Sequence, residues 1–361
     1  MRMVRTEPAG IPTVARRAVA LCLGLLTGLT MLAGASASTL EEMSFPSKAL
    51  GRPLTVSVYR PDLPAPETGW PVLYLLHGRD ANNRDWSSLA TIKVTLDRLI
   101  KSGRINPMLV VMPSAGNSWY VDSADVKGPG NYETALLNEL PTAFEKRFAP
   151  HCTRKSRAIA GISMGGFGAL RFAFKRPDRF VAVASLSGAL WQNIPTSQAM
   201  TAWAGASGSY FKRIDQATVV GGPDLPPEGA HFGGAFGTPF DPRRFNDANV
   251  FTLLARQIEA GSELPAIYLT VGDHDGLNFW RGSMALYETL MADRINIEFR
   301  VTDGDHTWSL WRKTIEDALE FVDSKFTPVT APPLVAVSPA MPSAASGEPA
   351  PKMAGGETVV K

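Results

Sequence analysis

The motif GISMG at residues 161–165 constrains the fold of this chain more than any other feature. A short apolar run at 158–160 precedes it, and a helical pattern that closes at Pro177 follows it. A G-x-S-x-G between a buried strand and a helix is typical of a nucleophile elbow, whose turn is too tight for side chains at the two flanking positions. Because the turn exposes the serine hydroxyl at the start of a helix, we predict that Ser163 is a nucleophile. The alternative is a glycine-rich turn that contains an incidental serine.

The pattern around this motif predicts an α/β protein. Apolar runs of strand length alternate with helical segments, which indicates a mostly parallel central sheet with helices on both faces. A helical pattern over 132–148 contains Pro141, which we expect to interrupt it, and the last helix has an apolar stripe that begins at Trp308. Between about 192 and 254 the regularity stops, and we expect a lid-like insertion. The expected strands cover residues 54–59, 72–76, 108–112, 158–160, 180–185, 266–271 and 295–301.

The two ends of the chain differ from its middle. Residues 1–37 contain two adjacent arginines, an apolar run and the small-residue sequence Ala35-Ser36-Ala37, which together predict a secretory signal peptide. An uncleaved membrane anchor is the alternative. Residues 327–361 are rich in Pro, Ala, Ser and Gly, so we expect a disordered tail. Residues 38–326 then form one catalytic domain, exported to the periplasm or the extracellular space.

The charge of the chain belongs largely to the expected signal peptide. The formal net charge is +2, and residues 1–37 hold four arginines against one glutamate, which leaves about −1 for the remainder. A chain with this charge balance has no basic surface excess that would indicate a nucleic-acid partner. Once the signal peptide is cleaved, we expect no stable insertion into a membrane. Cys152 would be the lone remaining cysteine, so no internal disulfide is expected. Nothing in the sequence indicates an oligomeric state.

A nucleophilic serine needs a base to accept its proton and an acid to orient that base. In this kind of fold the chain order is serine, then Asp or Glu, then histidine, with the last two in loops after late strands. Of five histidines, His306 alone has the right place in this order. The loop after 266–271 offers Asp273 and Asp275 as the acid. Asp275 is favoured because it lies further along the turn, and Asp273 stays open.

The sequence also indicates an oxyanion hole and a substrate pocket. Two backbone N–H groups should hold the tetrahedral intermediate, one from Met164 after the nucleophile and one from Arg79, in the loop that His77 helps to shape. Trp119, Tyr120 and Trp191 follow strand ends, where ligands bind in such sheets. These three aromatic side chains either line the pocket or pack the loops.

Together these motifs resemble the esterase D family of α/β-hydrolases, which includes S-formylglutathione hydrolases, feruloyl esterases and antigen 85 mycolyltransferases. The resemblance covers roughly residues 45–325. It implies an α/β-hydrolase fold, a triad of Ser163, Asp275 and His306, and oxyanion donors at Met164 and Arg79, and it supports Asp275 over Asp273. Antigen 85 proteins have leucine at the position of Arg79, which argues against a mycolyl substrate. The motifs that carry the resemblance are the elbow at 161–166, LLHG at 75–78 with Trp86, GNSWY at 116–120, Gly272-x-x-Asp275 and His306-x-Trp308-x-x-Trp311.

We therefore expect an exported serine carboxylesterase that uses no cofactor and no metal. Its substrate would be a small-molecule or glycolipid ester, cleaved through an acyl-enzyme on Ser163. The first alternative is an acyltransferase of the antigen 85 type, in which a sugar or lipid hydroxyl replaces water. Two others are a non-enzymatic binding protein on the same scaffold, and a metal-dependent hydrolase with ligands from the clusters at 273–275 and 303–306.

Overall fold

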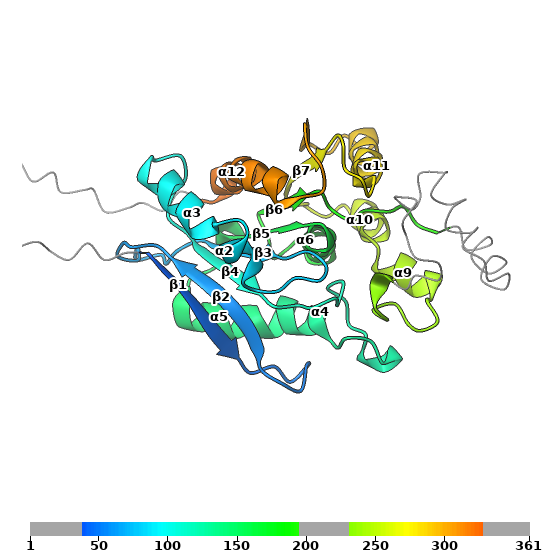
Figure 1. Ribbon diagram of the computed structural model, residues 1–361, viewed down its shortest axis with the longest axis horizontal. Coiled ribbons are helices and arrows are strands. Elements are labelled where there is room, and N and C mark those ends of the chain that lie inside the picture. The colour runs from blue at the N-terminus through cyan, green and yellow to red at the C-terminus, as the bar shows by residue number, and fades with distance from the viewer. Residues whose placement is uncertain (1–37, 195–230, 328–361) are drawn as a thin grey trace, which may run out of the picture. The chain divides into compact units, whose positions relative to one another are not determined.

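The computed structural model describes residues 38–194 and 231–327 (Figure 1). The expected signal peptide at 1–37, residues 195–230 of the expected insertion and the tail from 328 onward lie outside the described residues. Within the described part, no helix combines the length and apolar character needed to cross a membrane.

A single eight-stranded sheet forms the centre of the described chain, with strand order β1-β2-β4-β3-β5-β6-β7-β8. The pairs from β4 to β8 are parallel, whereas β1 pairs with β2 and β2 with β4 in antiparallel fashion. The mostly parallel sheet expected from the sequence is therefore confirmed. The strands are β1 Thr39–Phe45, β2 Leu54–Arg60, β3 Val72–Leu76, β4 Leu109–Pro113, β5 Arg157–Ile162, β6 Ala182–Leu186, β7 Ala266–Gly272 and β8 Ile297–Thr302.

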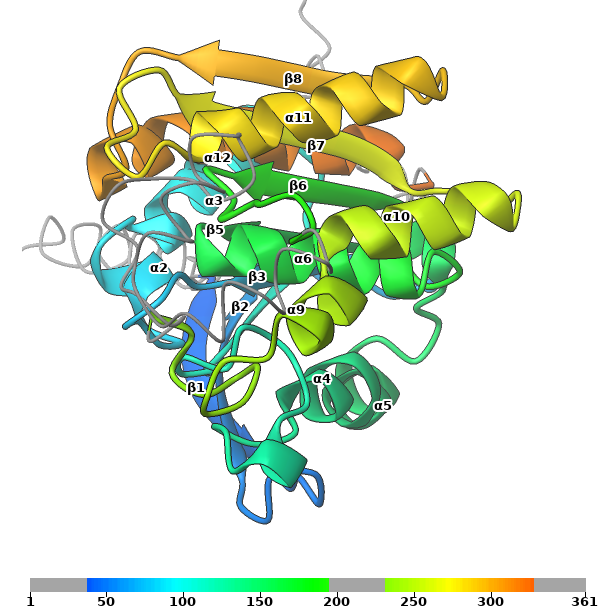
Figure 2. The same cartoon turned by 90° about the vertical axis from the view of Figure 1, so that its right-hand side faces the viewer.

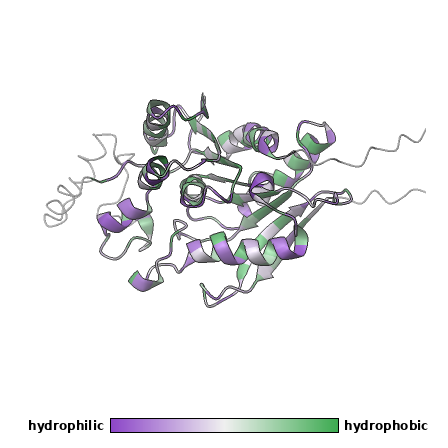
Figure 3. Cartoon of the chain, turned by 180° about the vertical axis from the view of Figure 1, so that it is seen from behind, coloured by the Kyte–Doolittle hydropathy of each residue, from purple (hydrophilic) through white to green (hydrophobic). Residues whose placement is uncertain are grey.

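Helices cover both faces of this sheet, as Figure 2 shows. On one face α3 and α12 bury apolar side chains such as Leu96 and Ile315, and on the other α5, α6, α10 and α11 bury side chains such as Phe144 and Leu254. Figure 3 shows hydrophobic residues concentrated on the strands between these layers. The helices are α2 Asp85–Ser88, α3 Ile92–Lys101, η1 Ala124–Val126, α4 Tyr132–Thr134, η2 Ala135–Glu139, α5 Leu140–Phe148, η3 Arg154–Ser156, α6 Met164–Lys175, α9 Pro242–Ala248, α10 Val250–Glu259, α11 Phe279–Ala292 and α12 Trp308–Lys325.

The first strand, β1, was not expected from the sequence. Its sequence TLEEMSF has no apolar run, because Glu41 and Glu42 are adjacent and both exposed. The strand lies at the edge of the sheet and pairs with β2 along its whole length. An edge strand needs little burial, and charged side chains on it oppose pairing with other chains.

The expected interruption at Pro141 is wrong, because the helix continues through it from α4 to α5. A π-helical turn, η2, comes directly before the proline, which lies in the first turn of α5. Proline has no N–H, and its ring crowds the carbonyl four residues earlier, here that of Leu137. Arg179 donates a hydrogen bond to this carbonyl. The wider turn and a side-chain donor thus replace the helical hydrogen bond that proline cannot make.

A buried arginine fixes α6, the helix that follows the elbow. The Arg171 side chain is 4% exposed and donates to the carbonyl oxygens of Tyr120 at 2.9 Å and Ala248 at 3.0 Å. It also pairs with the Glu133 carboxylate, which Lys175 contacts from the same helix. Since a buried guanidinium needs both a counter-charge and hydrogen-bond acceptors, this network fixes α6 relative to three separate segments of the chain.

Candidate active site

Ser163 occupies a strained turn between β5 and α6, with φ of 53° and ψ of −121°. A positive φ is uncommon for a residue with a side chain. A Cβ on Gly161 would lie 2.3 Å from the Gly165 oxygen, and one on Gly165 would lie 2.5 Å from the His77 oxygen. The two glycines are thus required by close backbone approach, which is the reason that the sequence motif implied.

Ser163, His306 and Asp275 are connected by hydrogen bonds. Nε2 of His306 lies 2.9 Å from Ser163 Oγ, and Nδ1 lies 2.8 Å from Asp275 Oδ2. Because a carboxylate only accepts, Nδ1 carries the proton and Nε2 is free to accept from the serine hydroxyl. The other oxygen of Asp275 accepts from the Leu277 N–H at 2.9 Å, and the residue is 3% exposed.

The structure separates the two aspartates that the sequence left open as acid. Asp273 is exposed, and its Oδ1 accepts from the Gly304 N–H at 3.0 Å and contacts Nδ1 of His274 at 2.7 Å. Its carboxylate therefore binds the neighbouring loop, and Asp275 alone of the two contacts His306.

Two aromatic rings pack against the His306 imidazole. Phe279, the first residue of α11, meets it edge-on at a centroid distance of 5.1 Å, and Trp311 of α12 does so at 4.9 Å. The Trp311 indole donates to Ser187 Oγ at 3.2 Å, which fixes its own orientation. Sequence reasoning did not select Phe279, since its position at the start of a helix after a catalytic-type loop was its only signal.

His77 organises the loop that contains Arg79. Its Nδ1–H donates to the Gly78 oxygen at 2.7 Å, and its Nε2 accepts from the Ala115 N–H at 2.8 Å. Burial lowers the pKa of this imidazole to about 4, so it is neutral at physiological pH. A Cβ on Gly78 would lie 3.5 Å from the Ser163 Cβ, so this loop passes beside the elbow.

The three aromatic residues expected near the substrate are all buried. Trp119, Tyr120 and Trp191 are 2%, 0% and 1% exposed. The Tyr120 hydroxyl donates to the His77 carbonyl at 2.8 Å, so this side chain supports the loop that contains Arg79. The two indoles lie 5.5 Å apart and both contact His231. Within the described residues, neither indole N–H nor either nitrogen of His231 has a hydrogen-bond partner.

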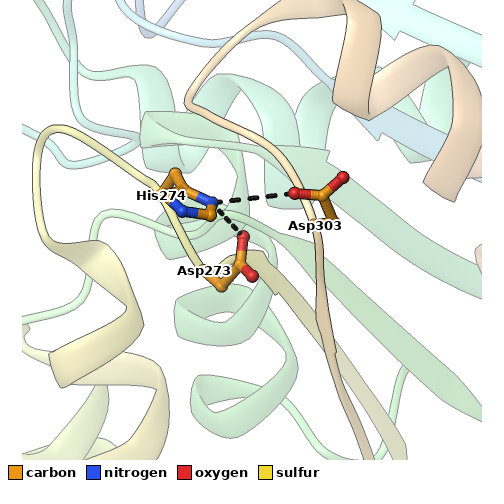
Figure 4. A group of neighbouring side chains, drawn as sticks. All are labelled: Asp273, His274 and Asp303. Atoms are coloured by element: carbon orange, nitrogen blue, oxygen red, sulfur yellow. Dashed lines mark hydrogen bonds and ion pairs between the residues drawn. The ribbon is translucent and has the colours of Figure 1, made fainter.

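A separate cluster of Asp273, His274 and Asp303 lies on the loops after β7 and β8 (Figure 4). Nδ1 of His274 is 2.7 Å from Asp273 and 3.7 Å from Asp303, and all three residues are exposed. Carboxylate oxygens and imidazole nitrogens are common ligands of metal ions in proteins. Of the other members of the expected metal clusters, Asp275 binds His306, His306 also contacts Ser163, and Asp305 accepts from the Gly276 and His306 N–H groups.

The fold and this arrangement define an α/β-hydrolase, with a serine after the central strand β5 and an acid and a histidine after β7 and β8. Residues 47–322 match the family described as "Putative esterase". The chain therefore belongs to this esterase family, and it is a serine hydrolase.

Individual relatives agree with this assignment. The chain is 27% identical to the acetyl esterase of Caldicellulosiruptor saccharolyticus over 69% of this chain and 82% of the relative. It is 26% identical to the diacylglycerol acyltransferase/mycolyltransferase Ag85A of Mycobacterium leprae, over 77% and 80% of the two chains. A solved ferulic acid esterase aligns with a TM-score of 0.56 at 26% identity, over 81% and 99% of the two chains. Other curated relatives are longer, and the chain spans 21 to 31% of their length.

Proposed function

We propose that this protein is an exported carboxylesterase with a catalytic triad of Ser163, His306 and Asp275. The observation that carries the proposal is the continuous hydrogen-bond chain from the Asp275 carboxylate through the imidazole to the serine oxygen, at 2.8 and 2.9 Å. These distances are within the range that proton transfer requires.

The proposed reaction begins when Ser163 Oγ attacks the ester carbonyl and Nε2 of His306 takes the hydroxyl proton. Asp275 stabilises the imidazolium that forms, and His306 then donates the proton to the leaving alcohol oxygen as the acyl-enzyme is made. Water attacks the acyl carbonyl with His306 again as base, and the acid is released. As the acyl–Ser163 bond breaks, His306 gives the proton that it took from water to Ser163 Oγ, so the enzyme ends as it began.

Backbone N–H groups of Met164 and Arg79 are the proposed oxyanion donors. Met164 begins α6, where the N–H groups are unpaired and the helix dipole favours negative charge. His77 holds the Gly78 carbonyl, and in a trans peptide the next N–H points the opposite way. The contact between His77 and Gly78 thus turns the Arg79 N–H away from the imidazole, which supports its role as the second donor.

Acyl transfer is the second candidate, and the similarity to Ag85A favours it. A sugar or lipid hydroxyl would replace water in the second half of the reaction, with the same triad. In either case we propose a small ester or a glycolipid as the substrate, with Trp119 and Trp191 beside its binding site. We also propose that residues 1–37 direct export, that 38–326 form the catalytic domain and that 327–361 form a tail.

Hydrolysis of chromogenic esters of increasing acyl length tests the proposal. Wild-type protein should be active and insensitive to chelator, and Ser163→Ala should lose activity by about 10⁴-fold or more. Cys152→Ser is the matched control, because burial raises the pKa of this alternative nucleophile to about 11 and the variant should keep full activity. Activity that survives in Ser163→Ala and disappears with chelator would overturn the serine mechanism in favour of a metal.

A further inference from the structure

The loops that carry Asp275 and His306 are joined by a third side chain, that of Asp305. Its Oδ1 accepts from the Gly276 N–H at 2.9 Å and from the His306 N–H at 2.6 Å. Gly276 directly follows Asp275 in the chain. A single carboxylate oxygen therefore binds the backbone beside the acid and the backbone of the base itself.

We propose that Asp305 is a positioning residue that fixes the distance between Asp275 and His306. This inference rests on the proposed function, because it assigns to Asp305 the alignment of two members of the proposed triad. The Asp305 carboxylate acts through the backbone N–H groups of Gly276 and His306 rather than through the Asp275 carboxylate or the imidazole ring.

The same two loops are also linked in the opposite direction. Asp273, on the loop of Asp275, accepts from the Gly304 N–H on the loop of His306 at 3.0 Å. Two backbone bonds also join the loops, from the Asp273 N–H to the Thr302 oxygen at 3.0 Å and from the His274 N–H to the Gly304 oxygen at 3.1 Å. Each loop thus supplies one carboxylate that binds an amide of the other.

The two loops also pack closely against each other at Gly272 and Gly304. A Cβ on Gly272 would lie 2.2 Å from the Gly304 oxygen, so the two loops touch where they leave the sheet. Further along the same loops, Asp305 binds the N–H groups of Gly276 and His306, and the Asp275 carboxylate binds the imidazole. Hydrogen bonds to a charged acceptor are stronger than neutral ones, which suits a carboxylate in an exposed position.

The two backbone contacts of Asp305 also favour its charged form. The N–H groups of Gly276 and His306 lower the pKa of this carboxyl below its ordinary value. The carboxylate form of Asp305, which accepts both hydrogen bonds, is therefore favoured to lower pH than in an unperturbed carboxyl group.

Four variants of the full-length chain separate geometry from charge. Asp305→Asn keeps an acceptor oxygen at the same position without charge, and Asp305→Glu keeps the charge but moves the oxygen by one methylene. Asp305→Ala removes both, and Asp303→Ala is the matched control on the same loop, where the side chain is 91% exposed. The readouts are kcat and KM for a chromogenic ester, with kcat normalised to active sites titrated with a serine-directed fluorophosphonate.

We expect kcat per active site to fall about 10- to 100-fold in Asp305→Ala and Asp305→Glu, with KM changed less than about 3-fold. Asp305→Asn should retain kcat within about 3-fold of wild type, as should Asp303→Ala. Asp305→Ala equal to Asp303→Ala would overturn the inference, as would Asp305→Asn as slow as Asp305→Ala. If Asp305→Ala does not fold, the comparison of the Asn and Glu variants decides. Failure of the triad itself is distinct, since it would show as full activity in Ser163→Ala.

Discussion

Nε2 of His306 and Oγ of Ser163 lie 2.9 Å apart although 143 residues separate them in the chain. Ser163 follows β5 near the middle of the sheet, whereas His306 follows β8 at its edge. Because β5, β6, β7 and β8 are all parallel, their carboxyl ends share one edge, and loops from that edge meet. The parallel arrangement of these strands is therefore what brings the proposed base and nucleophile together.

Asp275→Asn should reduce kcat by about 10⁴-fold with little change in KM. An asparagine amide can donate to Nδ1, which favours the tautomer with the proton on Nε2 and blocks acceptance from Ser163. Steady-state kinetics with a chromogenic ester provide the measurement, and Asp303→Asn is the exposed control. A kcat within about tenfold of wild type would argue against the assigned role of Asp275.

Gly161→Ala and Gly165→Ala should each unfold the elbow or destabilise the protein by about 3 kcal/mol or more. The added methyl groups would lie 2.3 and 2.5 Å from backbone oxygens, which cannot move aside as a flexible side chain would. Chemical denaturation measures the free energy of unfolding. Gly276→Ala is the comparison, since its methyl would meet nothing closer than 3.6 Å. Equal stability in all three variants would contradict the steric argument.

Arg171→Met should destabilise the protein by about 3 to 5 kcal/mol, because it leaves the buried Glu133 carboxylate without its main counter-charge. Burial acts to raise the pKa of Glu133, but Arg171 and Lys175 outweigh it and the pKa is lowered. A lowered carboxyl pKa adds stability above the unfolded-state value, and this part is lost as pH falls through the folded-state value. Arg176→Met is the exposed control, expected to change stability by less than about 1 kcal/mol. Equal midpoints of unfolding for both variants would refute the prediction.

Acidification from pH 6.5 to pH 4 should destabilise the protein in part through His77. Burial lowers the pKa of its imidazole from 6.5 to about 4. Between these two pH values the imidazole is protonated in the unfolded chain and neutral in the folded chain, so folding becomes less favourable as the pH falls. The contribution is at most about 3 kcal/mol. Urea unfolding at several pH values should show a shallower decline in His77→Gln, which lacks the titrating group. Parallel declines in both proteins would show that His77 does not contribute.

The sequence predicted the parts of the fold that depend on local pattern. Continuous apolar runs predict buried strands such as β5, and the two glycines predict the elbow. The edge strand β1 carries Glu41 and Glu42 because it needs little burial, so no such pattern exists there. At Pro141 the local rule predicted a break, but the π turn and the Arg179 contact with the Leu137 carbonyl are tertiary features that no local rule contains.

The candidate site divides in the same way. The sequence predicted Ser163 and His306 from their order along the chain and left Asp273 open beside Asp275 as the acid; in the structure the His306 ring contacts Ser163 and Asp275. The contacts of Phe279 and Asp305 could not be predicted from the sequence. An edge-on ring contact and a hydrogen bond to a distant amide depend on how the elements pack in three dimensions. Asp305 in particular reads as an ordinary solvated loop residue until the neighbouring loop is in place.

The left-handed backbone at Ser163 has a consequence for how this protein divides its work between folding and catalysis. A residue with a side chain at φ of 53° raises the energy of the native state by about 1 to 3 kcal/mol. Core packing supplies that energy when the chain folds, so the binding of an ester does not have to supply it. The Ser163 backbone therefore already has its strained conformation before a substrate binds. The strain lowers the stability of the folded chain instead of adding to the energy that each turnover requires.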